Sequence, residues 1–461
     1  MNSKNLLVGR LGRSFGAQGF LQAIQLFIRI AEVPLFLKYW GATGYGEWLM
    51  ISSLPSTLAL SDGGITKTAR REMVIRAGRS DYDGVLTVFQ STLFALIVMS
   101  ILIVGVITAI LPFIPINEWL NIGGSNAGDM IYTLLILAVQ VLVSFQCSLL
   151  FGGFASEKIT ATGTIYLAIT QLLGFVGMAA GVIFSKEMIF AASGALIGQC
   201  IGMLIMWFVL LKYSPRFKFG FKYSSFFEIK KLATPSFANL AFPFGEAINI
   251  QGVRLLVGVT LGPTALATYS SLRTLCRAAL QPVMSIARTI EPELSRAYGN
   301  LDFEKIRYFL VKGSQSAFWL SLMLCTIILF IGRPVFVGWT GGNLIFDWSV
   351  FLVLLSASLL NSLWCVALTV PCATNRHIKI AGYFIFIYGI IFLFLAFGLA
   401  KLFGLTGIAI ALLLVEVLML IVTMYVALAQ AEQSFLELFN VTMTFPRFYL
   451  KYVNIFSKYK K

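Results

Sequence analysis

Apolar stretches long enough to cross a bilayer follow one another along most of the chain, and they leave few folds open. A helix needs about 20 apolar residues to cross about 30 Å of hydrocarbon. Stretches of that kind occur at residues 14–37, 43–64, 84–112, 128–152, 160–184, 188–211, 232–257, 262–287, 308–332, 345–371, 380–400 and 404–430. The 461 residues are 58% hydrophobic and only 12% charged, values far from those of a soluble domain. We therefore predict an all-α polytopic membrane protein with about twelve transmembrane helices.

The positive charges are distributed unevenly between the two sides of these predicted spans. The even-numbered connections and the two terminal segments hold 26 of the 35 lysines and arginines, whereas the odd-numbered connections hold four. Cytoplasmic connections of membrane proteins carry such an excess of basic residues. We expect a multi-pass protein of a bacterial inner membrane with both termini in the cytoplasm. The net charge of +15 is then a topology signal, and nucleic acid is not expected as a partner.

The two halves of the sequence resemble each other. The stretch Gly41 to Trp48 follows the first span, and Gly262 to Tyr269 follows the seventh at a constant offset of 221 residues. With an even number of spans in each half, the repeats have the same orientation and are related by an axis along the membrane normal. We predict two parallel six-helix lobes around a central cavity. The predicted domains are an N-terminal lobe at 1–211, a cytoplasmic linker at 212–231, a C-terminal lobe at 232–430 and a cytoplasmic tail at 431–461.

The linker at 212–231 and the tail share a composition in which lysine and arginine alternate with phenylalanine and tyrosine. Aromatic rings at the acyl boundary and basic groups among phosphates are typical of segments that lie on anionic membrane lipids. An ordinary linker and tail that follow the positive-inside rule would have the same charge. Both interpretations remain open.

Four arginines inside the apolar stretches are the candidate substrate-binding residues: Arg29, Arg254, Arg273 and Arg277. An arginine at the centre of a bilayer costs roughly 2.5 to 3.5 kcal/mol on insertion scales, so such residues usually have a function. Arg273 and Arg277 are four residues apart, which places them on one helix face near the bilayer midplane. A bound phosphate would satisfy both guanidinium groups. The alternative is that they pair with Glu32, Glu246 or backbone carbonyl groups of a neighbouring helix.

Three acids are candidates for ion coupling or for internal ion pairs: Glu32, Asp62 and Glu246. Glu32 lies three residues from Arg29 and shares its helix face, so an internal ion pair is one interpretation. Asp62 precedes two glycines after a kink expected at Pro55, where a helix end alone would explain it. Glu246 is too far from Arg254 along the helix to pair with it directly. Exchange of H+ or Na+ at these acids would couple transport to an ion gradient.

No pattern in the sequence indicates an enzyme, a cofactor or a metal site. His377 is the only histidine, and the six cysteines show neither CxxC pairs nor metal-ligand spacing, so free thiols are expected. The sequence has no GxxxxGK[ST] phosphate loop. The start of the chain lacks a compact apolar core with a cleavage site, so the first membrane helix is expected to direct insertion. We predict a transporter that needs no cofactor.

The chain resembles the Wzx-type polysaccharide flippases of the multidrug/oligosaccharidyl-lipid/polysaccharide (MOP) exporter superfamily. The resemblance rests on the run Gly41 to Trp48 and on the kinked helix that ends in the run Leu60 to Arg71. It implies two V-shaped lobes, with a lumen lined chiefly by the first, second, seventh and eighth helices. The arginines on the first, seventh and eighth helices would then lie on lumen-forming helices.

The resemblance implies a function: a lipid-linked oligosaccharide, carried on undecaprenyl diphosphate, is flipped to the outer leaflet for surface polysaccharide such as O-antigen. Arg273 and Arg277, with Arg29, would hold the diphosphate. Polysaccharide polymerase machinery is an expected partner, and the chain is expected to be a monomer. The alternative is a cation-coupled multidrug antiporter of the same superfamily, in which acids rather than arginines would be expected in the lumen. A membrane glycosyltransferase would need a carboxylate or histidine cluster at one membrane face, and the sequence shows none.

Overall fold

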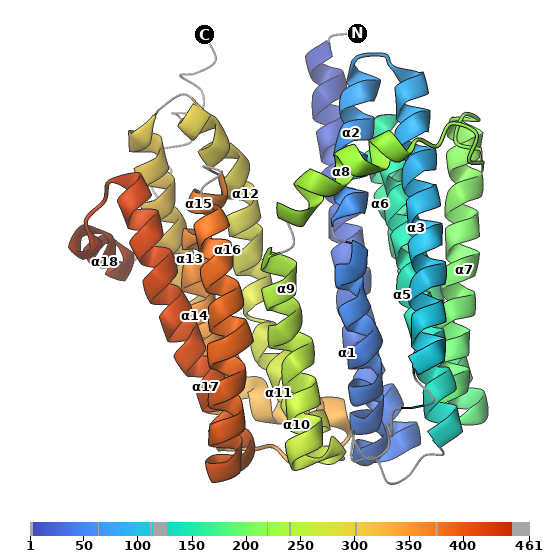
Figure 1. Ribbon diagram of the computed structural model, residues 1–461. Coiled ribbons are helices and arrows are strands. Elements are labelled where there is room, and N and C mark those ends of the chain that lie inside the picture. The colour runs from blue at the N-terminus through green and yellow to red at the C-terminus, as the bar shows by residue number, and fades with distance from the viewer. Residues whose placement is uncertain are drawn as a thin grey trace. The chain divides into compact units, whose positions relative to one another are not determined.

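Helices make up nearly all of the structure, a computed structural model that describes residues 3–62, 64–110, 113, 127–218, 220–238, 241–299, 302–373 and 377–444 (Figure 1). Eight of the helices in this part of the chain are long and apolar enough to cross a membrane. The prediction of an all-α membrane fold is confirmed, and the protein is a multi-pass membrane protein.

The described chain divides into two compact units, 1–271 with 337–345, and 272–336 with 346–461. The first unit contains α1 (Ser3–Thr57), η1 (Leu58–Asp62), α2 (Ile65–Gly78), α3 (Tyr82–Ile110), α5 (Ala127–Ser156), α6 (Thr160–Ser185), α7 (Met188–Tyr213), α8 (Phe226–Ala238), α9 (Ala241–Ala247), η3 (Ile248–Gly252) and α10 (Val253–Leu261). The lobe boundaries inferred from the sequence differ from these limits, because α10 packs against α1. They stay predictions about the arrangement of the two repeats.

The second unit contains the end of α11 (Pro263–Arg277) and then α12 (Leu280–Gly299), α13 (Phe303–Thr340), α14 (Trp348–Ala367), α15 (Thr369–Ala373), α16 (His377–Ile385), η4 (Phe386–Ile391), α17 (Phe392–Ala431) and α18 (Phe435–Met443). The short helix α18 is attached to α13 through its C-terminal carbonyl groups. Gln315 and Trp319 of α13 donate to the Thr444 carbonyl at 2.8 and 3.0 Å. These side chains satisfy acceptors that the end of a helix leaves open.

Helix α1 contains two predicted spans that meet at Gly41. This glycine has φ 68° and ψ −174°, outside helical geometry. The Trp48 ring, after this glycine, packs against the rings of Phe36 and Trp40, before it, with 5.6 and 5.4 Å between ring centres. The chain therefore turns back at Gly41, where the sequence predicts the first outer connection. Gly404 inside α17 has a similar break, with φ 56°.

The two repeated motifs meet within the first unit. Gly262 has φ 89° and ψ 168°, the same extended left-handed geometry as its counterpart Gly41. The equivalent threonines, Thr43 and Thr264, contact each other through their hydroxyl oxygens at 3.1 Å. A side chain at Gly46 would overlap the carbonyl group of Pro263. The repeat found in the sequence thus corresponds to two turns with matching backbone geometry that pack side by side.

Helices α6 and α7 pack closely because glycines line their interface. On α7, Gly194, Gly198 and Gly202 recur every four residues, and a Cβ atom at any of them would overlap α6. Small residues let helix backbones approach within van der Waals distance, a common way to hold membrane helices together. This close contact fixes the wall of the cavity that is described below.

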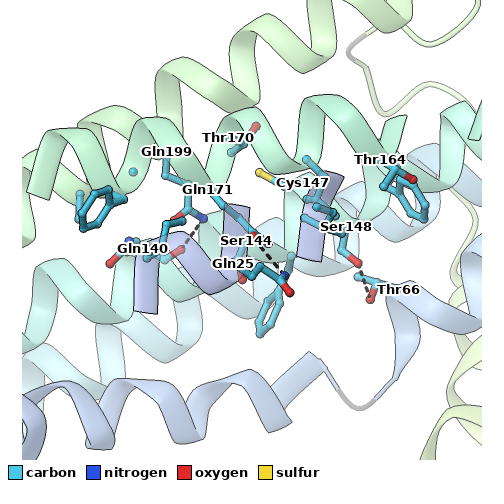
Figure 2. A pocket seen from close by; sticks show the side chains of 18 of the residues that line it. Gln25, Thr66, Gln140, Ser144, Cys147, Ser148, Thr164, Thr170, Gln171 and Gln199 are labelled. Carbon is cyan, nitrogen blue, oxygen red and sulfur yellow. Dashed lines mark hydrogen bonds between the residues drawn. The ribbon is translucent and has the colours of Figure 1, made fainter. Parts of the chain in front are cut away.

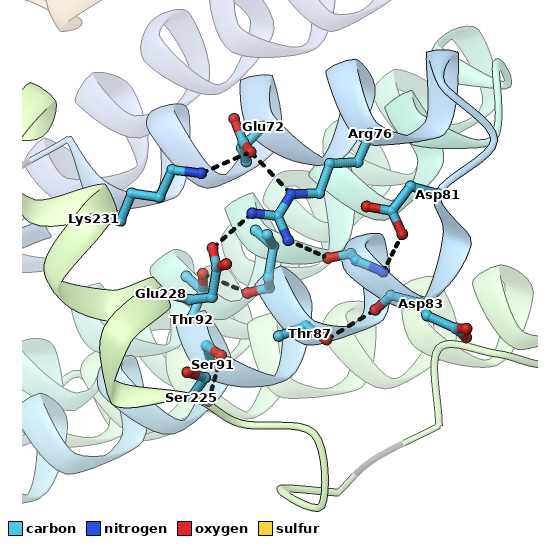
Figure 3. Close-up of polar contacts among 12 residues, drawn as sticks. Glu72, Arg76, Asp81, Asp83, Thr87, Ser91, Thr92, Ser225, Glu228 and Lys231 are labelled. Atoms are coloured by element: carbon cyan, nitrogen blue, oxygen red, sulfur yellow. Dashed lines mark hydrogen bonds and ion pairs between the residues drawn. The ribbon is translucent and has the colours of Figure 1, made fainter.

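The linker helix α8 is fastened to α2 by a network of ion pairs (Figure 3). Arg76 bonds to Glu72 at 2.9 Å and to Glu228 of α8 at 2.7 Å, and it also donates to the Gly84 carbonyl at 3.2 Å. Lys231 of α8 approaches Glu72 at 3.8 Å. Helix α8 of the linker is therefore fixed to the first unit by these ion pairs.

Candidate functional site

A cavity of about 800 Å³ opens within the first unit, among α1, α2, α5, α6 and α7 (Figure 2). That volume lies within the usual range of ligand pockets. Amide and hydroxyl groups form much of its wall. These polar lining residues are Gln18, Gln25, Thr66, Gln140, Ser144, Ser148, Thr164, Thr170, Gln171 and Gln199.

The amides of the cavity wall bond to one another between helices. The Gln25 amide of α1 donates to the Gln171 side-chain oxygen of α6 at 3.2 Å, and Gln199 of α7 donates to the Gln140 carbonyl of α5 at 3.1 Å. Each carboxamide has two donor hydrogens and an acceptor oxygen. One bond therefore fixes the orientation of a side chain and leaves further groups for a bound molecule.

Three basic and two acidic residues also line this cavity. The bases are Arg29, Lys67 and Arg70, and the acids are Glu32 and Asp62. The Arg70 guanidinium lies 5.3 Å from the centre of the Phe151 ring, a cation–π contact that holds it at the wall. The formal charge of the lining is thus positive.

Glu32 lies within electrostatic range of two of the predicted arginines. Arg254 of α10 and Arg29, the neighbour of Glu32 on α1, are both near enough to act on the Glu32 carboxylate. Arg254 also acts on the buried Tyr45 and donates to the Gln251 side chain at 3.4 Å. Arg29, Glu32 and Arg254 are therefore electrostatically coupled, although Arg254 comes from a distant part of the sequence.

The other two predicted acids are placed differently. Asp62 accepts from the Thr66 backbone N–H at 3.1 Å and from its hydroxyl at 2.7 Å, so it caps the start of α2 while facing the cavity. Glu246 lies on α9 with an exposed side chain. The helix-end interpretation of Asp62 agrees with its observed bonds.

Arg273 and Arg277 lie on the part of α11 that belongs to the second unit, close to a buried acid. Both arginines act electrostatically on Tyr388, and Arg277 also acts on Glu416 of α17. Glu416 is only 3% exposed. The sequence interpretation names Glu32 and Glu246 as the acids that would balance this pair, whereas the acid beside Arg277 in the second unit is Glu416. Pairing of the two arginines with an acid stays a prediction.

Glu416 is surrounded by hydrogen-bond donors from two other elements. Trp364 Nε1 donates at 2.6 Å, the Tyr388 hydroxyl at 2.9 Å, and the Asn361 amide at 3.1 and 3.3 Å. These donors satisfy the acceptor oxygens of a buried carboxyl group, which would otherwise lose its hydrogen bonds to water. The sequence showed an isolated glutamate in an apolar stretch, which was a visible signal, but its donors come from α14 and η4.

The described part of the chain contains no group of three or more metal-ligating side chains. The six cysteines are free, as the sequence predicts. The side chain of His377 lies outside the described residues.

Solved structures with a similar fold are membrane transporters. An inward-facing multidrug resistance MATE family transporter of the MOP superfamily superposes with a TM-score of 0.73, over 88% of this chain and 94% of that one, at 14% identity. An outward-facing MATE transporter superposes with a TM-score of 0.64, over 92% of this chain and 95% of that one, at 14% identity. The fold is that of the MATE transporters. These neighbours belong to the superfamily that the sequence resemblance names, whereas this chain's own membership and its flippase subtype stay predictions.

A third structure differs in the character of its pocket. It is a MOP superfamily transporter from Pyrococcus furiosus, described as having a binding pocket of reverse polarity that suggests a different function. It superposes with a TM-score of 0.59, over 92% of this chain and 95% of that one, at 15% identity. No protein-family model and no curated protein matches the chain.

Proposed function

We propose that this protein is a flippase that moves an undecaprenyl-diphosphate-linked oligosaccharide from the cytoplasmic to the outer leaflet. The lining of the first unit's cavity carries the proposal. A sugar presents many hydroxyl groups, and amides and hydroxyls can both donate to them and accept from them. The interhelical bonds of Gln25 and Gln199 hold such groups in place before a ligand arrives.

The basic residues of the cavity support an anionic head group. Arg29, Lys67 and Arg70 outnumber Glu32 and Asp62, and the Asp62 carboxylate is already engaged by Thr66. A guanidinium forms paired bonds with phosphate oxygens, and each bond to a charged group contributes roughly 1.5 to 3 kcal/mol. This gives the diphosphate a binding partner in the same cavity as the amides.

The remaining arginines have a smaller part in the proposal. Arg254 balances Glu32, and Arg277 lies beside Glu416. A phosphate bound by Arg273 and Arg277 would compete with the Glu416 carboxylate for Arg277. Exchange of H+ or Na+ at Glu32 would provide the coupling step.

The second candidate is a cation-coupled multidrug antiporter. The structural neighbours support it, because two of them are described as multidrug resistance transporters. Their folds favour this candidate more directly than the flippase. The polar and positively charged cavity favours the flippase, because repulsion weakens the binding of a cationic drug. The Pyrococcus furiosus neighbour supports the argument that pocket polarity and function vary together in this fold.

Complementation of a flippase-null strain distinguishes the two. We expect the double variant Arg29→Ala, Arg70→Ala to lower surface polysaccharide by about tenfold or more, since it removes bonds that each contribute over 1 kcal/mol. Arg333→Ala is the matched control, because Arg333 is an exposed arginine of α13 that lies outside this cavity. Full activity in the double variant, or drug resistance in place of complementation, would contradict the proposal.

A further inference from the structure

A second, apolar groove of about 600 Å³ runs along the first unit between α3, α5 and α7. Phe89, Leu93, Ile97 and Ile101 of α3 form one side, and Met203 and Trp207 of α7 form another. From Phe89 to Gly105 the groove follows α3 for about 24 Å, at 1.5 Å per residue. One leaflet contributes about 15 Å of hydrocarbon, so an acyl chain fits along the groove.

One end of this groove is covered by the chain segment that precedes α8. The Phe217 ring is buried against Phe89, with 5.1 Å between ring centres, and its carbonyl accepts from Trp207 Nε1 at 3.1 Å. Further along, Phe221 packs against Phe94 at 5.7 Å. This end of α3 is the one that the charge bias assigns to the cytoplasm.

The covering segment, residues 214–218 and 220–223, contains three basic residues and no acidic one. Arg216 is already engaged, since it stacks 4.0 Å from the centre of the Tyr82 ring and approaches Glu157 at 3.5 Å. Lys218 and Lys222 are exposed and form no ion pair with any residue in the described part of the chain. The Lys222 ammonium group lies 5.7 Å from the centre of the Tyr223 ring. Two exposed ammonium groups without an acidic partner among the described residues therefore stand at the covered end of an apolar groove.

Aromatic residues mark this region as one that contacts lipid. Phe226 and Phe227, at the start of α8, are 79% and 74% exposed. Large exposed aromatic rings beside basic groups are typical of segments at the boundary between acyl chains and head groups. The groove, the lysines and these rings thus occupy the same edge of the first unit.

We propose that this groove binds an anionic glycerophospholipid of the cytoplasmic leaflet, with an acyl chain between α3, α5 and α7 and the head-group phosphate at Lys218 and Lys222. Each lysine near an anionic surface contributes about 1 kcal/mol, whereas a neutral phospholipid gains no such attraction. The proposal does not depend on which substrate the protein transports.

Native mass spectrometry of the purified full chain tests it, with phosphatidylglycerol and phosphatidylcholine as probes. We expect phosphatidylglycerol to be retained in preference. Lys218→Gln with Lys222→Gln should weaken its binding about fivefold per lysine at low ionic strength. Lys401→Gln is the matched control, because Lys401 is an exposed lysine of α17 in the second unit.

A second variant fills the groove itself. A side chain at Gly105 would meet open space, so Gly105→Leu should occupy the groove without disturbing the backbone. Gly398→Leu, also into open space but on α17, is its control. The site is supported if the double lysine variant and Gly105→Leu both lose bound phosphatidylglycerol while both control variants retain it. Equal retention of the two lipids, or no effect of Gly105→Leu in a folded protein, overturns it.

Discussion

Tyr388→Phe offers a sharp test of the buried cluster around Glu416, because it removes one hydroxyl group and keeps the ring. The Tyr388 side chain is fully buried, and its hydroxyl donates to the Glu416 carboxylate at 2.9 Å. A hydrogen bond to a charged group contributes roughly 1.5 to 3 kcal/mol in soluble proteins. Side-chain bonds between membrane helices average only about 0.6 and reach about 1.7 kcal/mol.

We expect Tyr388→Phe to lower the free energy of unfolding by about 1 to 2 kcal/mol. The value lies at the upper end of the membrane range because the acceptor is a fully enclosed carboxyl group and the bond is short. It is not larger, since Trp364 and Asn361 continue to donate to the carboxylate. The measurement is reversible unfolding in mixed detergent micelles, with Tyr383→Phe as the control, because Tyr383 on α16 is 50% exposed.

A second comparison separates the bond from other effects of the substitution. In a Glu416→Leu background Tyr388→Phe should cost almost nothing, because its acceptor is gone. If that background does not fold, Trp364→Phe alone should produce a loss of similar size, through the bond at 2.6 Å. The reasoning is refuted if Tyr388→Phe unfolds like Tyr383→Phe, within about 0.3 kcal/mol.

Two other predictions concern the packing of the first unit. Gly46→Ala should destabilise the protein by about 1 to 3 kcal/mol, because its Cβ atom would overlap the Pro263 carbonyl group. Gly338→Ala should not destabilise it, because a Cβ atom there meets open space. Thermal unfolding of both variants checks this. Glu228→Gln should release α8 from Arg76 and speed amide exchange in residues 226–238. The control Glu437→Gln on α18 should leave those exchange rates unchanged. Equal exchange in the two variants would show that the ion pair does not hold the linker.

The sequence was sufficient to predict what depends on local patterns. Apolar stretches of about 20 residues predicted the helices, and the matching turns at Gly41 and Gly262 predicted a repeat whose threonines do meet. Backbone geometry at these turns follows from glycine, which takes positive φ at little cost. For the same reason the break within α1 was placed correctly, between the first two spans.

The sequence alone could not predict interactions between helices that are distant along the chain. The spacing of Arg29 and Glu32 indicated a local pair, but Arg254 of α10 also acts on Glu32. Glu416 is an isolated glutamate in an apolar stretch of the sequence, and only the structure shows that Arg277 is within electrostatic range of it. The cavity wall, with Gln140, Gln171 and Gln199 from three helices, depends in the same way on tertiary packing.

Transport by the purified protein in proteoliposomes is the most direct test of the proposed function. A lipid-linked oligosaccharide is placed in the inner leaflet, and its appearance outside is followed with a lectin, with ethidium movement measured in parallel. We predict that the oligosaccharide becomes accessible, that Arg29→Ala with Arg70→Ala slows this step, and that ethidium does not move. Movement of ethidium without movement of the oligosaccharide would contradict the flippase and favour the antiporter.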